Sequence, residues 1–389
     1  MRYRILTLNN ISARGLERLP RDRYEVAPDL ERPDAILVRS GDMHATPIAA
    51  SLLAVGRAGA GVNNIPVAEF SKRGIPVFNT PGANANAVKE LVLAGLLLAA
   101  RNICPAWEFA RSLEGDDHTI DAAVEKGKKK FVGFEMPGRT LGVVGLGAIG
   151  VEVANSALAL GMKVLGYDPQ ITVQRAWQLS ANVEQALSLE DLFARADAVS
   201  VHVPLNDHTQ KLVNEARLKL MKKSGILLNF ARAAIVDDAA VIAALNDGRL
   251  HAYVCDFPNT LLKDHPKVVT LPHLGASTGE AEENCAVMVA DQVRDYLENG
   301  NIRNSVNYPE AVLPRAPSTT RLAIANSNVP NMVGQISTCL AAARINIAEL
   351  LNKSRGEYAY TLVDAEGAIG EDLLTKIRSI DGILSARIV

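Results

Sequence analysis

The sequence contains few of the features that mark secreted or metal-binding proteins. Only four of its 389 residues are cysteines, and Cys104, Cys255, Cys285 and Cys339 show no metal-ligand spacing. We therefore expect reduced thiols in the protein core and no bound metal. The first ten residues, MRYRILTLNN, enter a strand pattern directly and lack the hydrophobic region of a signal peptide.

Long hydrophobic runs and an excess of charge of one sign are also missing. The longest apolar run, Leu91–Ala100, is too short to cross a bilayer and lies between Glu90 and Arg101, so it predicts a buried helix. A formal net charge of −2 provides no general attraction to nucleic acid or to an anionic membrane. These absences predict a cytoplasmic protein that binds neither, and the length predicts two or three domains.

A glycine-rich segment, Gly142–Asp168, is the most informative part of the chain. A strand pattern meets a turn with Gly145, Gly147 and Gly150, and a helical pattern, a second strand and Asp168 follow. The first glycine permits the tight turn, the second lets backbone N–H groups approach a pyrophosphate, and the third lets the helix pack closely on the strand. In this context the turn predicts a dinucleotide site rather than a purely structural turn.

Asp168 indicates which dinucleotide is bound. It lies 18 residues after the last glycine, where a carboxylate can accept hydrogen bonds from the adenosine ribose. The same charge would repel a 2′-phosphate, and Pro169 and Gln170 provide no nearby arginine. The sequence therefore predicts NAD rather than NADP.

The order of strand and helix patterns predicts three folded parts. Residues 1–80 alternate short apolar strands with helices, and residues 141–270 alternate strictly, which favours a doubly wound parallel sheet. A helix expected at Gly279–Glu298 makes the first part discontinuous if it packs back on it. A proline-containing linker, Asn301–Thr319, precedes a final β-α-β-β-α-β pattern at 320–389.

Two side chains follow predicted strands at the edge where cofactor and substrate meet in such sheets. Arg232 can clamp a carboxylate with two hydrogen bonds, although it can also cap a helix or pair with Asp237. His273 can take the proton from a hydroxyl as a hydride leaves the same carbon, although a lone histidine is usually structural. The turns Arg57–Asn63 and Asn79–Asn84 can bind an anionic substrate, but ordinary turns explain them about as well.

Taken together, the motifs resemble the D-isomer-specific 2-hydroxyacid dehydrogenase family from Met1 to about Asn304. The resemblance rests on RAGAGVNNI (Arg57–Ile65), NTPGANANAVKE (Asn79–Glu90), VVGLGAIG (Val143–Gly150), HVPL (His202–Leu205), NFARAAIVD (Asn229–Asp237) and PHLGAST (Pro272–Thr278).

The resemblance implies an NAD-dependent dehydrogenase in which Arg232 binds the substrate carboxylate and His273 is the general acid and base. It implies substrate contacts at Arg39, Arg57 and Arg232. It implies cofactor contacts at Thr80, Gly145, Gly147, Ala148, Ile149, Gly150, Asp168, Phe230, Ala231, Asp256, Gly275 and Ala276.

One position departs from the family pattern. A glutamate normally follows the aspartate that matches Asp256 and orients the histidine, but Leu261 stands in its place. Either Asp264 takes the orienting role, or the imidazole is held without a carboxylate. Ala233 also replaces the usual glycine after the arginine, which is a mild change.

The final part resembles an ACT regulatory domain, which implies a ferredoxin-like fold. The resemblance implies an effector site for an amino acid such as L-serine at Asn326, Asn328 and Asn346. Asn326 replaces the histidine of serine-sensing members, and its amide can donate and accept as a neutral imidazole does. A purely structural role is the alternative. Related units pair edge to edge, so we expect a homodimer or homotetramer.

The resulting expectation is an α/β enzyme that oxidises a phosphorylated D-2-hydroxy acid, because Arg57 supplies a further cationic group. Another D-2-hydroxy acid, such as glycerate or lactate, and an NAD-sensing corepressor on the same fold stay open as alternatives. We expect a Rossmann domain inserted in a discontinuous flavodoxin-like substrate domain, with boundaries at 1–90 (substrate domain), 91–272 (Rossmann domain), 273–303 (substrate domain), 304–319 (linker) and 320–389 (ACT domain).

Overall fold

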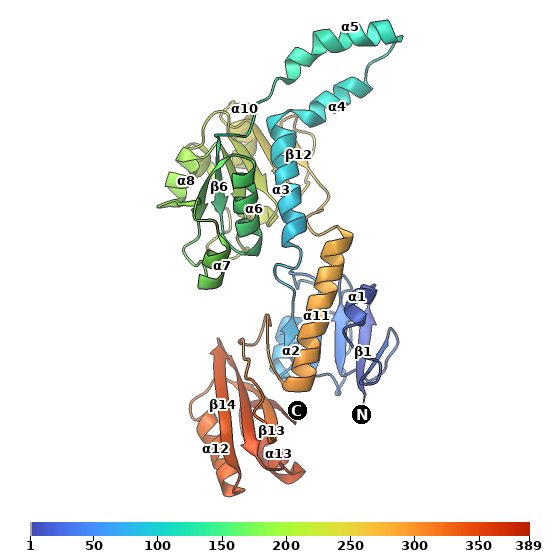
Figure 1. Ribbon diagram of the computed structural model, residues 1–389, viewed down its shortest axis with the longest axis vertical. Helices are drawn as coiled ribbons and strands as arrows, with labels where there is room; N and C mark the ends of the chain where they lie inside the picture. The colour runs from blue at the N-terminus through green and yellow to red at the C-terminus, as the bar shows by residue number, and fades with distance from the viewer. Residues whose placement is uncertain (1) are drawn as a thin grey trace. The chain divides into compact units, whose positions relative to one another are not determined.

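The computed structural model describes residues 2–389, and the chain forms two units by its internal contacts (Figure 1). The first unit combines residues up to Ala83 with Gly279–Val389, and the second comprises Asn84–Thr278. The chain therefore passes between the units before α3 (Ala85–Ala100), which opens the second unit, and before α11 (Gly279–Asn299), which returns to the first.

A five-stranded parallel sheet forms the centre of the first unit. Its strand order is β2-β1-β3-β4-β5, which is the flavodoxin-like order. α11 packs against α1 and against three of the strands, so a segment distant in sequence completes this domain, as predicted. The elements are β1 (Tyr3–Leu8), α1 (Ala13–Leu16), β2 (Tyr24–Ala27), β3 (Ala35–Val38), β4 (Ala54–Arg57), α2 (Val67–Lys72) and β5 (Val77–Phe78).

A seven-stranded parallel sheet forms the second unit. Its order is β12-β11-β10-β9-β6-β7-β8, so the strand order reverses between β6 and β9, and the doubly wound prediction is confirmed. The strands are β6 (Thr140–Val144), β7 (Lys163–Tyr167), β8 (Glu184–Gln185), β9 (Ala198–Val201), β10 (Ile226–Asn229), β11 (Ala252–Cys255) and β12 (Val268–Thr270). The helices between them are α6 (Ala148–Ala159), α7 (Val173–Gln178), α8 (Leu189–Arg195), α9 (Glu215–Leu218), η2 (Ala233–Ile235) and α10 (Asp238–Asn246).

A helical arm extends from this unit after α3 (Figure 1). It consists of α4 (Ile103–Arg111), α5 (Asp117–Gly127) and the short η1 (Lys128–Phe131), where the sequence indicated only a polar segment. Asp116 caps α5 by accepting a hydrogen bond from the Thr119 N–H at 2.9 Å. α4 has no buried residue, so the arm is held by few contacts of its own.

The C-terminal part belongs to the first unit and has the predicted ferredoxin-like fold. Its antiparallel sheet has the order β14-β15-β13-β16, and helices α12 and α13 share a core with one face of it. Residues on the other face, including Tyr360 and Leu362, join the core that contains Tyr296 of α11. The elements are β13 (Thr319–Ser327), α12 (Met332–Ala342), β14 (Asn346–Arg355), β15 (Tyr358–Glu366), α13 (Glu371–Arg378) and β16 (Ile383–Ile388).

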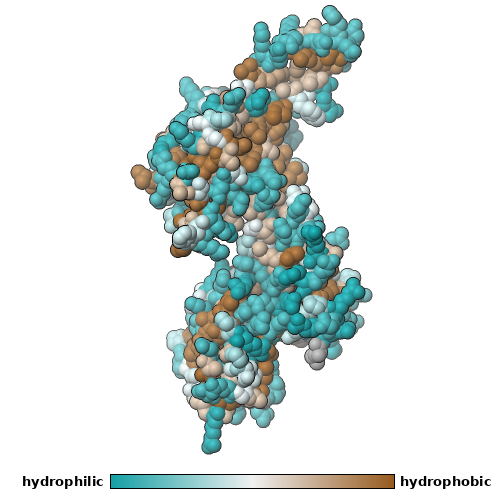
Figure 2. All heavy atoms as spheres, in the orientation of Figure 1, coloured by the Kyte–Doolittle hydropathy of each residue, from teal (hydrophilic) through white to brown (hydrophobic). Residues whose placement is uncertain are grey.

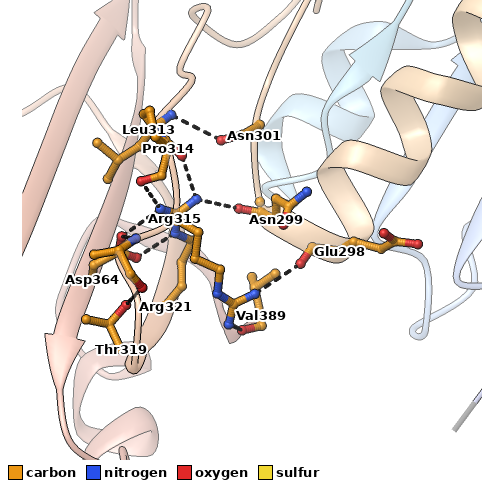
Figure 3. A network of polar contacts seen from close by, with 12 residues as sticks. Glu298, Asn299, Asn301, Leu313, Pro314, Arg315, Thr319, Arg321, Asp364 and Val389 are labelled. Atoms are coloured by element: carbon orange, nitrogen blue, oxygen red, sulfur yellow. Dashed lines mark hydrogen bonds and ion pairs between the residues drawn. The ribbon is translucent and has the colours of Figure 1, made fainter.

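A fully buried ion pair fixes the start of this part (Figure 3). Arg321 donates to the two carboxylate oxygens of Asp364 at 2.6 and 2.7 Å, and its other N–H groups bond the carbonyls of Asn299, Leu313 and Pro314. All five guanidinium donors are therefore satisfied away from water. We call this arrangement the Arg321 clamp.

The C-terminal part also caps the end of α11. The last carbonyls of a helix lack partners within the helix, and cations are favoured there by the helix dipole. Side chains of the C-terminal part and its linker bond these carbonyls in succession. The bonds run from Arg387 to Tyr296 and Leu297, from Arg315 to Glu298, from Arg321 to Asn299 and from Tyr360 to Gly300. Residues 301–319 therefore lie between the end of α11 and β13, which these bonds hold together.

Within residues 2–389, no helix is both long and apolar enough to span a membrane.

Candidate active site

The glycine turn after β6 has the geometry that a pyrophosphate needs. Gly145 has a φ of +92°, and a Cβ at Gly150 would lie 1.9 Å from the Gly145 carbonyl oxygen, so both positions require glycine. Gly147 faces open space and caps α6 without a side-chain hydrogen bond. The first N–H groups of α6, including those of Ala148 and Ile149, therefore start at the turn, three residues earlier than the sequence pattern indicated.

Asp168 lies beside a cavity that fits the adenosine end of a dinucleotide. The cavity has a volume of about 200 Å³ and is lined by Leu146, Gly166, Asp168, Ile171, Leu179, Val183, Glu184 and Gln185. The two carboxylate oxygens accept hydrogen bonds from the backbone N–H groups of Leu146 and Gln170, each at 2.9 Å. Their remaining lone pairs can accept from ribose hydroxyls, so these residues fit NAD.

Arg232 lies in a turn that a buried asparagine holds in place. Asn229, at the end of β10, donates to the Arg232 carbonyl at 3.0 Å and accepts from the Ala231 N–H at 3.1 Å. Asp237 caps α10 and pairs with Lys211, so it is not the partner of Arg232. Among residues 2–389, the exposed guanidinium of Arg232 bonds the Ala231 carbonyl alone, which leaves donors for a carboxylate.

His273 follows β12 at the same sheet edge and has a φ of +55°, in the left-handed region that non-glycine residues rarely adopt. Buried Asp256 accepts from the N–H groups of Leu274 and Gly275 at 2.8 and 2.9 Å, which fixes the loop after the histidine. The His273 and Phe257 rings pack in a T-shaped arrangement with a centroid separation of 5.4 Å. Both carboxylate oxygens of Asp256, which was predicted as a cofactor contact, are therefore used to hold the loop after His273.

The structure bears on the two predicted arrangements of the histidine, with Asp264 as its orienting partner or with no carboxylate. Asp264 is 78% exposed and pairs with Lys263 at 2.8 Å. Leu261, at the position of the missing glutamate, is also exposed. Within the second unit, the His273 ring therefore contacts the aromatic ring of Phe257 rather than the Asp264 carboxylate.

Other predicted cofactor contacts differ in what their side chains do. The Phe230 side chain packs in the core against Gly95, so only its backbone remains for a ligand. Gly275 is buried beside Asp256, and Ala276 is exposed.

The predicted residues of the first unit lie at the ends of the neighbouring strands β3, β4 and β5. Arg57 donates from Nε to the Arg39 carbonyl at 3.1 Å, which joins the two neighbouring strand ends. Arg39 also pairs with Glu282 of α11. Thr80 is fully buried, and its hydroxyl lies beside the Cys285 thiol.

Comparison with known proteins identifies the family. The family sequence model for the NAD-binding domain of D-isomer-specific 2-hydroxyacid dehydrogenases matches residues 93–275. The chain is 35% identical over 355 residues to a D-3-phosphoglycerate dehydrogenase of Haemophilus influenzae, covering 88% of this chain and 82% of that protein. The chain belongs to the D-isomer-specific 2-hydroxyacid dehydrogenase family.

Two further relatives agree with this assignment. A D-3-phosphoglycerate dehydrogenase of Methanocaldococcus jannaschii is 36% identical over 296 residues, but these cover 74% of this chain and only 54% of that protein. The solved structure of NAD⁺-bound 3-phosphoglycerate dehydrogenase from Entamoeba histolytica matches with a TM-score of 0.61 and 25% identity over 79% of this chain and 99% of that one. The chain is thus an NAD-binding dehydrogenase, and its second unit is the cofactor domain.

The predicted effector residues of this dehydrogenase lie apart. Asn326 is buried, and its amide bonds the Ser327 carbonyl and the Thr361 hydroxyl. Asn328 and Asn346 are exposed, but the strand register places them at opposite ends of the C-terminal sheet. No single ligand therefore reaches both within one chain.

Three residues that contact predicted site residues were not predicted from the sequence: Asn229 and Phe257 in the second unit, and Glu282 in the first. An asparagine at the end of a buried strand is a recognisable turn signal, so Asn229 could have been found. Phe257 and Glu282 act through contacts between segments 16 and 243 residues apart in sequence, and no local pattern marks them.

Proposed function

We propose that this dehydrogenase oxidises D-3-phosphoglycerate to 3-phosphohydroxypyruvate, with NAD as hydride acceptor, in the first step of L-serine biosynthesis. The observation that carries the proposal is the pair of arginines at the neighbouring ends of β3 and β4, where Arg57 Nε donates to the Arg39 carbonyl. A substrate with a carboxylate and a phosphate needs this second set of donors. The relatives, which are D-3-phosphoglycerate dehydrogenases, support the same substrate.

Each proposed role follows from the geometry of the residue. Arg232 binds the substrate carboxylate with its unused guanidinium donors. His273 takes the proton from the C2 hydroxyl, and the Asp256 contacts hold its loop in place. The glycine turn and Asp168 would hold the pyrophosphate and ribose of NAD, which would supply the acceptor for the hydride from C2. Thr80 would contact the nicotinamide end.

The direct test is absorbance at the nicotinamide band with purified protein, NAD and a panel of D-hydroxy acids. We expect reduction of NAD with D-3-phosphoglycerate at a kcat/KM at least about tenfold above that with D-glycerate or D-lactate, since losing paired charge–charge hydrogen bonds costs more than about 1.4 kcal/mol. A preference for an unphosphorylated acid contradicts the assignment of D-3-phosphoglycerate as substrate. NAD binding without turnover of any acid favours an NAD-sensing protein.

The helical arm supports a homodimer. Ile103 and Trp107 of α4, Val124 of α5, and Val132 all expose apolar surface, and Figure 2 shows apolar residues along one side of the arm. A small helix pair held by few internal contacts is poorly stable alone, so we propose that the arm of a second copy covers this side. Trp107→Glu should convert dimer to monomer in light scattering, whereas Trp177→Glu, at the other exposed tryptophan, should not.

The C-terminal sheet supports an L-serine site between two copies. β14 is a long, exposed edge strand, and edge strands of this kind pair with another chain. Because β14 runs from the end near Asn346 to the end near Asn328, antiparallel pairing of two β14 strands brings the partner subunit's Asn346 to the Asn328 end. If each chain pairs with one copy through β14 and with another through the helical arm, four chains would form a homotetramer.

The test is a serine titration of NAD-dependent activity in point variants. Asn328→Ala and Asn346→Ala should each raise the inhibitory serine concentration by about tenfold, the value of a lost hydrogen bond to a charged ligand, and Lys376→Ala on α13 should not. Wild-type activity that is unaffected by millimolar serine, without a calorimetric binding signal, would assign the part a structural role.

We also propose a cytoplasmic location and the expected domain boundaries. All four cysteines are free, which fits a reducing compartment. Cell fractionation tests the location, and limited proteolysis tests the boundaries.

A further inference from the structure

Arg39, one of the two arginines that bind the substrate phosphate in our proposal, already forms an ion pair with the Glu282 carboxylate. Arg39 Nη2 lies 2.5 Å from Oε1 of Glu282, in the first turns of α11. The two side chains are 38% and 42% exposed, so the pair is open to solvent and to a ligand. One of the five guanidinium donors of Arg39 is thus already used by an anion.

The fold fixes Glu282 in this position. Its neighbours Ala281 and Cys285 are buried, and Cys285 belongs to the core beneath the parallel sheet. The start of a helix also favours acidic side chains. The backbone at 282 therefore cannot move far from Arg39, although the half-exposed carboxylate can rotate.

The charges of Arg39, Arg57 and Glu282 all act on the buried Cys285 thiol. Burial raises the pKa of this thiol, the contact with Thr80 and the guanidinium groups of Arg57 and Arg39 oppose the shift, and Glu282 adds to it. Two cations and one anion therefore share the site, so its net charge is about half of what the two arginines would supply alone.

We propose that Glu282 is a specificity-determining residue that competes with the substrate phosphate for Arg39. Because a partly exposed ion pair is weak, the phosphate displaces Glu282 from Arg39, but the carboxylate stays close and repels the bound anion. Glu282 therefore weakens binding of phosphorylated acids and leaves unphosphorylated acids unaffected. The inference rests on the proposed function, in which Arg39 binds the phosphate.

The test compares Glu282→Gln with Glu283→Gln. Both remove one charge from the same helical turn with little change in shape, but Glu283 pairs with Arg14, outside the site, at 2.8 Å. Steady-state kinetics with D-3-phosphoglycerate and with D-glycerate, and inhibition by inorganic phosphate, are the measurements. Thermal unfolding of both variants checks that each is folded.

Glu282→Gln should lower the KM for D-3-phosphoglycerate and the inhibition constant of inorganic phosphate by about three- to tenfold, the scale of an exposed ion pair. The kcat, and all constants with D-glycerate, should stay within twofold. Glu283→Gln should match the wild type. Equal changes in both variants, or an unchanged or raised KM in Glu282→Gln, overturn the inference.

Arg39→Met separates this inference from the proposed function. A raised KM for D-3-phosphoglycerate in Arg39→Met, with an unchanged KM in Glu282→Gln, overturns the role of Glu282 and leaves the substrate in place. Unchanged KM and unchanged phosphate inhibition in Arg39→Met overturn both, because the phosphate then binds elsewhere.

Discussion

At the scale of single residues, the two proposed catalytic groups are held through their backbones. Asn229 bonds the carbonyl of Arg232, and Asp256 bonds the N–H groups after His273. Their side chains make few contacts within the cofactor domain, so most of their donors and acceptors are left for substrate. This arrangement fixes position without occupying the reactive atoms.

The first prediction separates binding from chemistry. Arg232→Lys should raise the KM for the hydroxy acid about tenfold or more, because an ammonium does not reproduce the two-pronged contact with a carboxylate. His273→Ala should lower kcat by roughly 10²–10⁴, the usual contribution of a positioned acid–base group. NAD affinity, measured by fluorescence titration, should stay nearly unchanged in both. Equal loss of NAD binding would make both residues structural.

The second prediction concerns cofactor choice. Asp168→Asn should narrow the preference for NAD over NADP, because the amide no longer repels a 2′-phosphate. The amide can keep only one of the two backbone bonds that the carboxylate oxygens now accept, so NAD affinity should also fall. The kcat/KM for each dinucleotide is the measurement. A wild-type enzyme that uses both equally would place Asp168 away from the ribose.

The third prediction concerns the missing glutamate. Because Asp264 pairs with exposed Lys263, Asp264→Asn should leave kcat within about twofold, the limit expected for an exposed ion pair. Phe257→Ala should lower kcat, because the Phe257 ring packs against the imidazole, and Phe257→Tyr should restore it. A large loss in Asp264→Asn would instead assign the orienting role to that carboxylate.

Residues whose role depends on the local sequence pattern could be predicted from the sequence. Residues whose role depends on contacts with distant segments were harder to predict. The glycine turn, Asp168, Arg232 and His273 each adjoin a strand end, and that placement is visible in the sequence. Asn326 is an effector contact in the sequence hypothesis, and in the structure its side chain is buried and internally bonded. Burial of a polar residue depends on partners that a single strand does not reveal.

At the scale of elements, α11 has a different function at each end. Its first turns carry Glu282, which bonds Arg39, and its last carbonyls are capped by the C-terminal part. The helix, about 30 Å long at 1.5 Å per residue, thus connects the C-terminal part with the proposed phosphate site. The helix itself was predictable from its pattern, but its caps were not, because they come from side chains up to 91 residues away.

The fourth prediction concerns the Arg321 clamp. Arg321→Met should lower the free energy of unfolding by about 3–5 kcal/mol, because it leaves a buried Asp364 without its partner. Arg321→Met/Asp364→Leu should be less destabilised than Arg321→Met alone, since no buried charge remains. Chemical denaturation gives both values. A larger loss of unfolding free energy in the double variant than in Arg321→Met would contradict the proposed energetics of the clamp.

The pH dependence of the clamp has a definite sign. Burial alone would raise the pKa of Asp364, but hydrogen bonds from Arg321 and from the Ala316 N–H outweigh it and hold the pKa below its usual value of 3.8. The stability that the carboxylate contributes is therefore complete above that value and is lost as the pH falls below it. The difference in Tm between wild type and Arg321→Met should shrink below about pH 4.

At the scale of the whole molecule, the C-terminal part is joined to the substrate domain by a shared core. Tyr360 and Leu362 of its sheet belong to the same apolar cluster as Tyr296 of α11. The fifth prediction is that deletion of residues 320–389 destabilises the substrate domain, because it exposes this cluster and uncaps α11. The truncated chain should show a lower Tm, in calorimetry, than Lys376→Ala. An unchanged Tm for the remaining domains would make the C-terminal part an independent module.

The capped end of α11 has a consequence for how this protein can evolve. A gene that lost the codons after residue 319 would remove Arg321, Tyr360 and Arg387 together, and with them most of the bonds to the last carbonyls of the helix. Such a loss would survive selection only if substitutions elsewhere supplied a new cap in the same lineage. Duplication and divergence of the C-terminal part are constrained in the same way, since its inward sheet face must keep matching the helix while its outer edge is free to acquire a new ligand.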